Sequence, residues 1–263
     1  MSSYPSIEFY DISCTTTKEP WSPFTARTYL ALRLLGIPFK RHLVTMVQIA
    51  PLLSAAGVPQ PANGERYTLP AITLSSSSGE KEWITENVKI SEVLQKLYLE
   101  HGGELSKSLY PGDACTEAIE KVRQAFKDSL YNECHRWKNI HPRIYTILEP
   151  ESRDFFIKTR IGDFGKPPQE ILDTDAKENE ERDGGIVKVY VKTLEPLANL
   201  YKKKDERGGV WLCGERANYA DLMVLGLIQW MKCTNPEVFE EALKEVGGAL
   251  EKAWIAGQEL FQE

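Results

Sequence analysis

Ser22 is the residue whose type and position could most directly do chemistry, because it lies where a polar loop meets a predicted helix. Trp21-Ser22-Pro23-Phe24-Thr25 places a serine at a preferred N-cap position and a proline at the first helical position, where its missing N–H costs nothing. The N–H groups and dipole at a helix start favour an anion, and the Ser22 hydroxyl could donate a hydrogen bond to it. A capped helix without further function is the plain alternative.

Two further segments contain residues that could set the backbone conformation or bind a charged ligand. Pro70 opens what otherwise resembles a strand over residues 67–74, which indicates either an edge strand or a cis peptide bond. Thr85-Glu86-Asn87 stands between a predicted strand and a predicted helix. Capping by Thr85 or Asn87 is the plain account; alternatively, Glu86 could meet an ammonium group while Asn87 and the helix N–H groups bind a carboxylate.

The elements that must position these residues follow from hydrophobic spacing and turn residues. Strands are predicted over 7–12, 39–46, 67–74 and 81–85, and helices over 22–36, 48–56 and 87–98. A strand-helix-strand unit followed by a hairpin and a closing helix packs as a small mixed sheet with helices on its faces. This order predicts a thioredoxin-like fold, in which the start of the first helix faces a site that handles a thiol or disulfide.

The second half of the chain is predicted to be helical. Apolar positions follow helical spacing over 116–137, 152–161 and 186–201, and 222–231 is apolar nearly all round. Asn218 and Asp221 are three residues apart and predict a capping box before that last helix. The charged stretch 173–183 is interpreted as a solvated helix start or a connector. We therefore predict a thioredoxin-like domain over 1–103 and an all-helical domain over 104–263.

Composition narrows the classes of function. Thirty-two Lys and Arg against thirty-eight Asp and Glu give a net charge of −6, which argues against a molecule covered by a nucleic-acid-binding surface. Five scattered cysteines have neither disulfide-like nor metal-ligand spacing, so we expect reduced thiols and no metal. We also expect no secretory signal, no membrane span and a cytoplasmic location.

The motifs together resemble the glutathione transferase superfamily, in the correct order along nearly the whole chain. The N-terminal resemblance rests on Ser22-Pro23-Phe24-Thr25, Leu30-Ala31-Leu32, Gly36-Ile37-Pro38-Phe39, Thr68-Leu69-Pro70 and Glu86-Asn87. The C-terminal resemblance, to fungal and bacterial etherase-related (Fu-type) transferases, rests on Thr159-Arg160, Phe164-Gly165, Gly214 and Asn218-Tyr219-Ala220-Asp221. It implies a cytosolic glutathione transferase fold, an α/β thioredoxin-like domain followed by an all-α domain.

The resemblance also implies a role for each site residue, with glutathione as cosubstrate. Ser22 would be catalytic, donating a hydrogen bond to the glutathione sulfur and favouring the thiolate. Leu69, before a cis Pro70, would pair its backbone with the cysteinyl part of glutathione, and Glu86 and Asn87 would bind its γ-glutamyl group. The family usually has a serine where this chain has Asn87. Cysteine-type relatives have their reactive thiol at the position of Ser22, so conjugation or ether cleavage is favoured over deglutathionylation.

Trp21 and Phe24 are predicted to form part of a pocket for an apolar electrophile, with Tyr131, Trp137 and Tyr145 as further candidates that could equally be core. Cys14 is either a reactive thiol or an incidental one, and His135 and His141 are interpreted as structural. The sequence thus predicts a homodimeric transferase acting on aromatic electrophiles, in detoxification or aryl ether cleavage. The alternatives are a ligandin-like, glutathione-dependent carrier of aromatic compounds and a regulatory protein that keeps the fold without its chemistry.

Overall fold

A small mixed sheet forms the first part of the computed structural model, which describes residues 4–62, 65–75, 79–205 and 209–262. Its strands lie in the order β2-β1-β3-β4, with β1 and β2 parallel and the other neighbours antiparallel. Their bounds are β1 (Ser6–Ile12), β2 (Lys40–Val44), β3 (Ala71–Ser75) and β4 (Lys81–Thr85). Residues 76–78, where the turn of the hairpin was predicted, lie outside the described residues.

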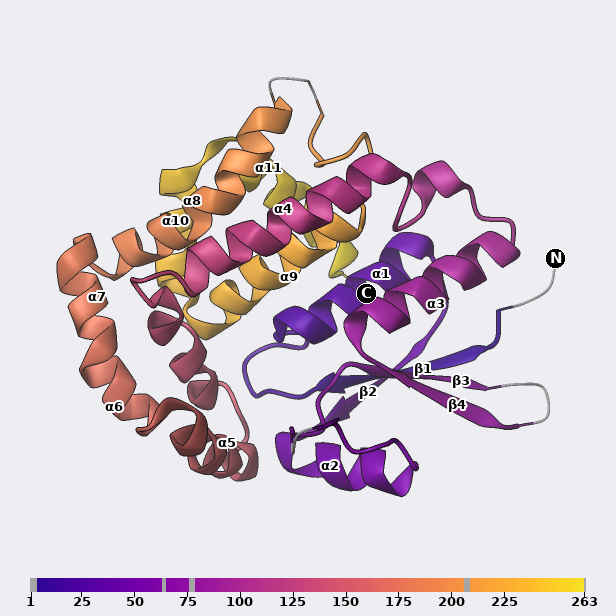
Figure 1. Cartoon of the computed structure of the whole chain (residues 1–263), viewed down its shortest axis with the longest axis horizontal. Coiled ribbons are helices and arrows are strands. Elements are labelled where there is room, and N and C mark those ends of the chain that lie inside the picture. Colours follow the sequence, from indigo (N-terminus) through magenta and orange to yellow (C-terminus); the bar gives the residue numbers. More distant parts are fainter. Residues whose placement is uncertain (1–3, 63–64, 76–78, 206–208, 263) are drawn as a thin grey trace.

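Helices cover the sheet and make up the rest of the chain. α1 (Pro23–Leu35) and α3 (Asn87–Glu100) lie on one side of the sheet and α2 (Met46–Ala55) on the other (Figure 1). The remaining helices are α4 (Asp113–Leu130), α5 (Pro150–Phe164), α6 (Pro168–Asp173), α7 (Asp175–Asp183), α8 (Ile186–Asp205), α9 (Tyr219–Thr234), α10 (Pro236–Val246) and α11 (Gly248–Gly257). The chain therefore has a thioredoxin-like region followed by a mostly helical one, as predicted.

Element boundaries differ from the sequence prediction by a few residues, and two of these differences have a local cause. The strand expected over 67–74 begins only at Ala71, after the cis Leu69–Pro70 bond. The helix expected over 116–137 ends at Leu130, because the Asn132 side chain bonds the Asp128 carbonyl (2.8 Å) and the Cys134 N–H (3.0 Å) and so turns the chain. The charged stretch 173–183 contains α7, which confirms the helical interpretation.

Helix α9 forms the centre of the helical region and begins at the predicted capping box. Asn218 Oδ1 accepts from the Ala220 N–H at 3.0 Å, and Asp221 Oδ2 accepts from the Asn218 N–H at 3.1 Å. The other Asp221 oxygen accepts from the Tyr201 hydroxyl at 2.7 Å and from the Leu212 N–H at 3.0 Å. Asp221 is fully buried, so these bonds fix the start of α9 to α8 and to the loop that precedes it.

Helix α1 joins the two regions, since it packs against α3 on one side and most extensively against α9 on the other. Gly226 of α9 allows a close approach: a Cβ there would lie 2.7 Å from the Pro23 carbonyl oxygen. The predicted boundary between residues 103 and 104 falls between α3 and α4 and stays a prediction. Within the described residues, no helix is both long and apolar enough to cross a membrane.

Candidate functional site

The sheet topology brings the three predicted segments to one edge. β1 runs antiparallel to β3 and pairs Tyr10 with Ala71, so the end of β1 and the start of β3 share an edge. Ala71 also pairs with Thr85, which places the end of β4 and the following Glu86 at that same edge. The Thr28 hydroxyl of α1 then donates to Asn87 Oδ1 of α3 (3.4 Å). The cis proline and the start of α3 thus lie at one edge, and α1 is tied to the start of α3 through Thr28.

Ser22 occupies the predicted N-cap of α1. Its Oγ accepts from the Phe24 N–H at 3.4 Å, and Pro23 stands at the first helical position. Because the hydroxyl acts as an acceptor in this bond, its proton stays available for donation to a ligand. Ser22 is buried, which puts such a ligand atom in a setting where a hydrogen bond to an anion is strong.

The Leu69–Pro70 peptide bond is cis, as the thioredoxin-like fold implied. Leu69 is buried and stands before the first residue of β3, so its backbone lies outside the β1–β3 pairing that begins at Ala71. Its N–H and C=O are therefore placed at the strand's open end, where an extended ligand can continue the pairing.

Glu86 has an unusual backbone, with φ 73° and ψ 122°, and stands at the N-cap position of α3. In the part of the chain that the structure describes, no side chain caps this helix start. The plain capping account of Thr85 and Asn87 is therefore wrong, since Asn87 instead bonds Thr28. The Glu86 side chain is exposed, and the α3 N–H groups beside it can meet an anion.

Trp21 and Phe24 differ in what they can offer a ligand. The Trp21 indole is only 3% exposed and donates to the Ser13 carbonyl at 3.2 Å, which anchors the loop before α1. The Phe24 ring is 51% exposed beside Ser22, so it is the better placed of the two to contact an apolar ligand. Tyr131 is exposed as well.

Trp137 belongs to a cluster of rings around His141, together with Phe156, Phe164 and Trp230. Burial lowers the pKa of His141 to about 4, with a smaller effect of the nearby Arg160 cation. His141 is therefore neutral near pH 7 and packs as an aromatic residue, which agrees with its structural interpretation.

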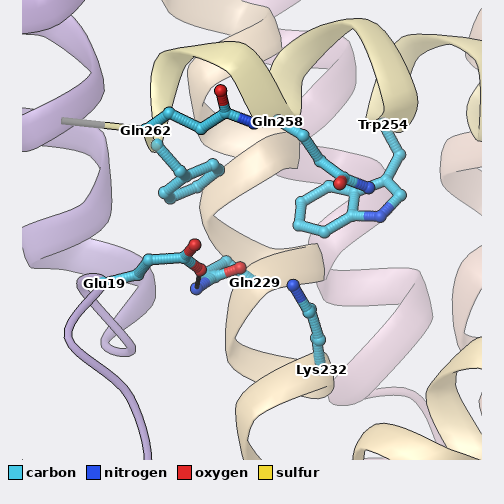
Figure 2. A pocket seen from close by; sticks show the side chains of 7 residues that line it. Glu19, Gln229, Lys232, Trp254, Gln258 and Gln262 are labelled. Carbon is cyan, nitrogen blue, oxygen red and sulfur yellow. Dashed lines mark hydrogen bonds between the residues drawn. The ribbon is translucent and has the colours of Figure 1, made fainter.

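A small pocket lies beside the loop before α1, between that loop, α9 and the end of the chain (Figure 2). Gln229 Nε2 donates to Glu19 Oε2 at 2.9 Å across it, while Gln229 Oε1 is buried without a partner. Its volume of about 40 Å³ suits about one water molecule and not an aromatic ligand. This contact ties the loop before α1 to α9 and could not be predicted from the sequence, because its two residues are 210 positions apart.

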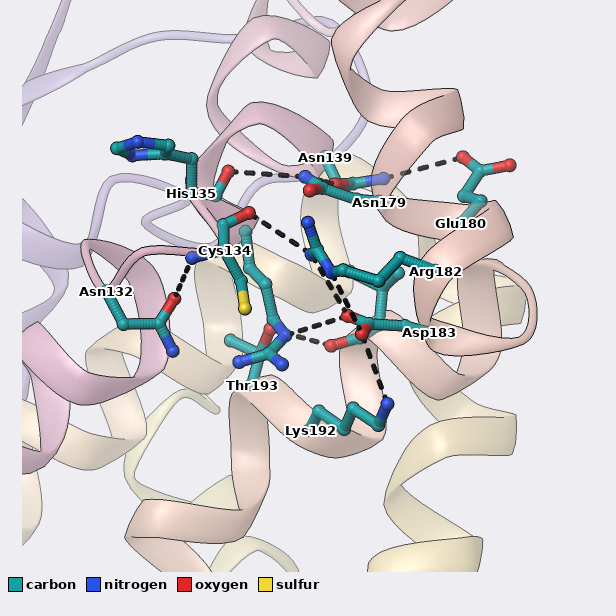
Figure 3. A network of polar contacts seen from close by, with 12 residues as sticks. Asn132, Cys134, His135, Asn139, Asn179, Glu180, Arg182, Asp183, Lys192 and Thr193 are labelled. Carbon is teal, nitrogen blue, oxygen red and sulfur yellow. Dashed lines mark hydrogen bonds and ion pairs between the residues drawn. The ribbon is translucent and has the colours of Figure 1, made fainter.

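A network of polar contacts lies in the helical region, around Asp183 (Figure 3). Burial alone would raise the pKa of Asp183, but the cations of Arg136, Lys192 and Arg182 hold it at about 2. Asn139 and Asn179 bond each other at 2.7 Å nearby. This network joins the segment after α4 to α7 and α8. Because the Asp183 carboxylate is already paired with three cations of the protein, we interpret the network as structural.

The cysteine and acidic side chains of the described residues form no further candidate site. Cys14, Cys115, Cys134, Cys213 and Cys233 form no disulfide with one another. Cys14 is half-buried, with its sulfur 3.5 Å from the Thr17 carbonyl oxygen. Among the residues that the structure describes, no group of three or more His, Cys, Asp or Glu is arranged to hold a metal ion.

Comparison with known proteins agrees with this architecture. Residues 121–256, just over half of the chain, match the family model "Glutathione S-transferase, C-terminal domain". The glutathione S-transferase-like protein ustS of Aspergillus flavus is 25% identical over 95% of this chain and 89% of its own length. The chain therefore belongs to the glutathione S-transferase family.

Two solved structures share the whole fold. Glutathione transferase GSTFuA3 from Phanerochaete chrysosporium aligns with a TM-score of 0.76 and 20% identity, over 99% of both chains. The glutathione S-transferase CsGST63524 of Ceriporiopsis subvermispora, in complex with glutathione, aligns with a TM-score of 0.76 and 21% identity, over 98% of both chains. The resemblance to Fu-type enzymes that the sequence predicted is thus confirmed at the level of fold.

Proposed function

We propose that this chain is an active glutathione transferase, which binds glutathione at the shared sheet edge and activates its thiol with Ser22. The proposal is supported by the combination of a buried serine N-cap on α1 with a cis proline and a helix start without a side-chain cap, the last two at one edge of the sheet. Ser22 donates to the sulfur, the Leu69 backbone pairs with the cysteinyl residue, and Glu86 meets the γ-glutamyl ammonium. The α3 N–H groups, with Asn87, bind the neighbouring carboxylate.

The chemistry is nucleophilic attack by the glutathione thiolate on an electrophilic carbon. The S–H proton leaves for solvent as the thiolate forms, the sulfur–carbon bond forms, and a leaving group departs with the electron pair where the electrophile carries one. Hydrophobic aromatic compounds fit this site best because Phe24 offers an exposed ring beside Ser22. Detoxification and aryl ether cleavage are the expected uses, in a cytoplasmic homodimer.

Initial rates of glutathione conjugation to a panel of aromatic electrophiles, including a β-aryl ether and an isothiocyanate, test the proposal. Ser22→Ala removes a hydrogen bond to an anion worth about 1.5–3 kcal/mol, so kcat/KM should fall roughly ten- to a hundredfold. The pKa of the bound thiol, followed by thiolate absorbance against pH, should rise in the same variant.

Ser22→Ala also removes an N-cap, so the fold needs its own control. Ser22→Gly removes the hydroxyl but is nearly neutral as a cap, whereas Ser22→Thr keeps both hydroxyl and cap. Activity should follow the hydroxyl: low in Ala and Gly, retained in Thr. Calorimetric titration with glutathione separates the other outcomes, since saturable binding without turnover would indicate the carrier and no binding the regulatory protein.

A further inference from the structure

Arg27 of α1 is a partly exposed cation that packs against aromatic rings. Its guanidinium carbon lies 5.2 Å from the Phe24 ring centre and 5.5 Å from that of Phe126 on α4, so the group sits between two aromatic faces. Its Nε is buried without a hydrogen-bond partner, while the residue as a whole stays partly exposed. Among the described residues, no Asp or Glu forms an ion pair with Arg27.

Burial makes the positive charge of Arg27 costly to keep without an anion nearby. It lowers the pKa of the Arg27 guanidinium, while the nearby Tyr219 acts in the opposite direction and the Arg123 cation adds a smaller lowering effect. Arg123 itself is exposed and paired with Glu120. Two aromatic faces offset only part of the loss of hydration of a cation, so a small anion that reaches the guanidinium would bind there favourably.

Space for the aromatic part of such a ligand lies in a neighbouring groove. A groove of about 230 Å³ between α3 and α4 is lined by Val88, Glu92, Tyr110, Thr116, Ile119, Glu120, Arg123 and Tyr219. Arg27 does not line it, and of the two carboxylates of the groove Glu120 is paired with Arg123. Arg123 and Tyr219 are the two groups that act electrostatically on Arg27. An apolar cavity of about 150 Å³ holds benzene, so the groove has room for one substituted aromatic ring.

We propose that Arg27 selects acidic aromatic cosubstrates, with an anionic substituent of the electrophile bound by the guanidinium between Phe24 and Phe126. The proposal rests on the transferase function above. Arg27 follows the N-cap Ser22 by five residues, which is about 7.5 Å along the axis of α1 and about 140° around it, so the long Arg27 side chain has to span part of that distance. An electrophile that places its reactive carbon at Ser22 and its acid at Arg27 therefore needs one aromatic ring with a short linker, as in aryl carboxylates of the cinnamate type.

Matched pairs of electrophiles test this selectivity. The ratio of kcat/KM for an aryl carboxylate to that for its methyl ester is measured in the wild type, Arg27→Met, Arg27→Lys and Lys121→Met. A guanidinium–carboxylate pair predicts a preference of roughly tenfold for the acid, lost in Arg27→Met and reduced in Arg27→Lys, which keeps the charge but not the two-pronged geometry. Lys121 is exposed and paired with Glu117 on α4, so Lys121→Met removes one positive charge elsewhere on the molecule and should keep the ratio.

A binding measurement separates this proposal from the transferase function. Calorimetric titration of the same acid and ester, with glutathione absent, should show the acid preference even if no electrophile is turned over. Met preserves the aliphatic packing of Arg27 against Gly226, and thermal unfolding checks the fold of each variant. An equal acid-to-ester ratio in the wild type and Arg27→Met would overturn the proposal, as would an Arg27→Met defect confined to glutathione affinity, which would assign Arg27 to a glutathione carboxylate.

Discussion

Glu86 offers a test that separates backbone strain from ligand binding. Its φ of 73° lies in the region that favours glycine, at the entry to α3. Glu86→Gly and Glu86→Ala both remove the carboxylate that we assign to the glutathione ammonium. Only glycine also removes the strain, because alanine keeps a Cβ.

The expected magnitude follows from two opposing effects. A non-glycine residue at such a φ costs about 1–3 kcal/mol, and glycine loses about 0.5–1 kcal/mol more conformational entropy on folding than alanine. Glu86→Gly should therefore be more stable than Glu86→Ala by about 1 kcal/mol, which is the reverse of the usual order. Both variants should bind glutathione at least about tenfold more weakly than the wild type, since each lacks the same charged hydrogen bond.

Urea unfolding measures the stability difference and calorimetry the glutathione affinity. Glu82 is the matched control: it is an exposed glutamate on β4 with no positive φ, so Glu82→Ala should be the more stable of its Ala and Gly pair and should bind glutathione as the wild type does. An Ala variant at position 86 as stable as the Gly variant would refute the strain argument. Unchanged glutathione affinity in both would refute the assigned contact.

Two further predictions concern the contact between α1 and α9 at Gly226 and the aromatic cluster around His141. Gly226→Ala should destabilise the fold by about 1–3 kcal/mol and slow conjugation, because the new methyl group forces α9 away from Pro23. Gly162→Ala is the control and should have neither effect, since the space around Gly162 is open. Urea unfolding and initial rates of conjugation measure both variants. For His141, burial depresses the folded pKa to about 4 against 6.5 in the unfolded chain, so the wild type loses stability as pH falls through that window. His141→Phe should gain about 2 kcal/mol relative to the wild type between pH 7 and pH 5, and a constant difference in unfolding free energy would contradict this.

Local signals in the sequence sufficed for much of the fold. Ser22 and Pro23 at the start of α1 and the capping box of Asn218 and Asp221 are confirmed, because a cap depends on residues within one turn of each other. The sheet was predicted from strand order, and the cis bond before Pro70 from the fold that this order implied.

The structural features that could not be predicted from the sequence depend largely on contacts between distant residues. The end of α4 at Leu130 is set by Asn132, whose side chain competes with the helix for backbone groups, a choice that apolar spacing does not reveal. Arg27 meets Phe126 from a position 99 residues earlier in the chain, and Glu19 meets Gln229 across an even longer separation. Hydrophobic periodicity predicts which face of a helix is buried, but it does not predict which element packs against that face.

These long-range contacts explain why the proposed chemistry requires both halves of the chain. Helix α1 carries Arg27 and begins after its N-cap Ser22. It is positioned by a bond from Thr28 to Asn87 of α3 on one side and by its close approach to Gly226 of α9 on the other. Glutathione is assigned to contacts from the sheet region, whereas the groove beside Arg27 is walled by α3 and α4. A shift of α9 would therefore move Ser22 and the proposed selectivity residue together, so thiol activation and choice of electrophile should respond jointly to changes in the helical region.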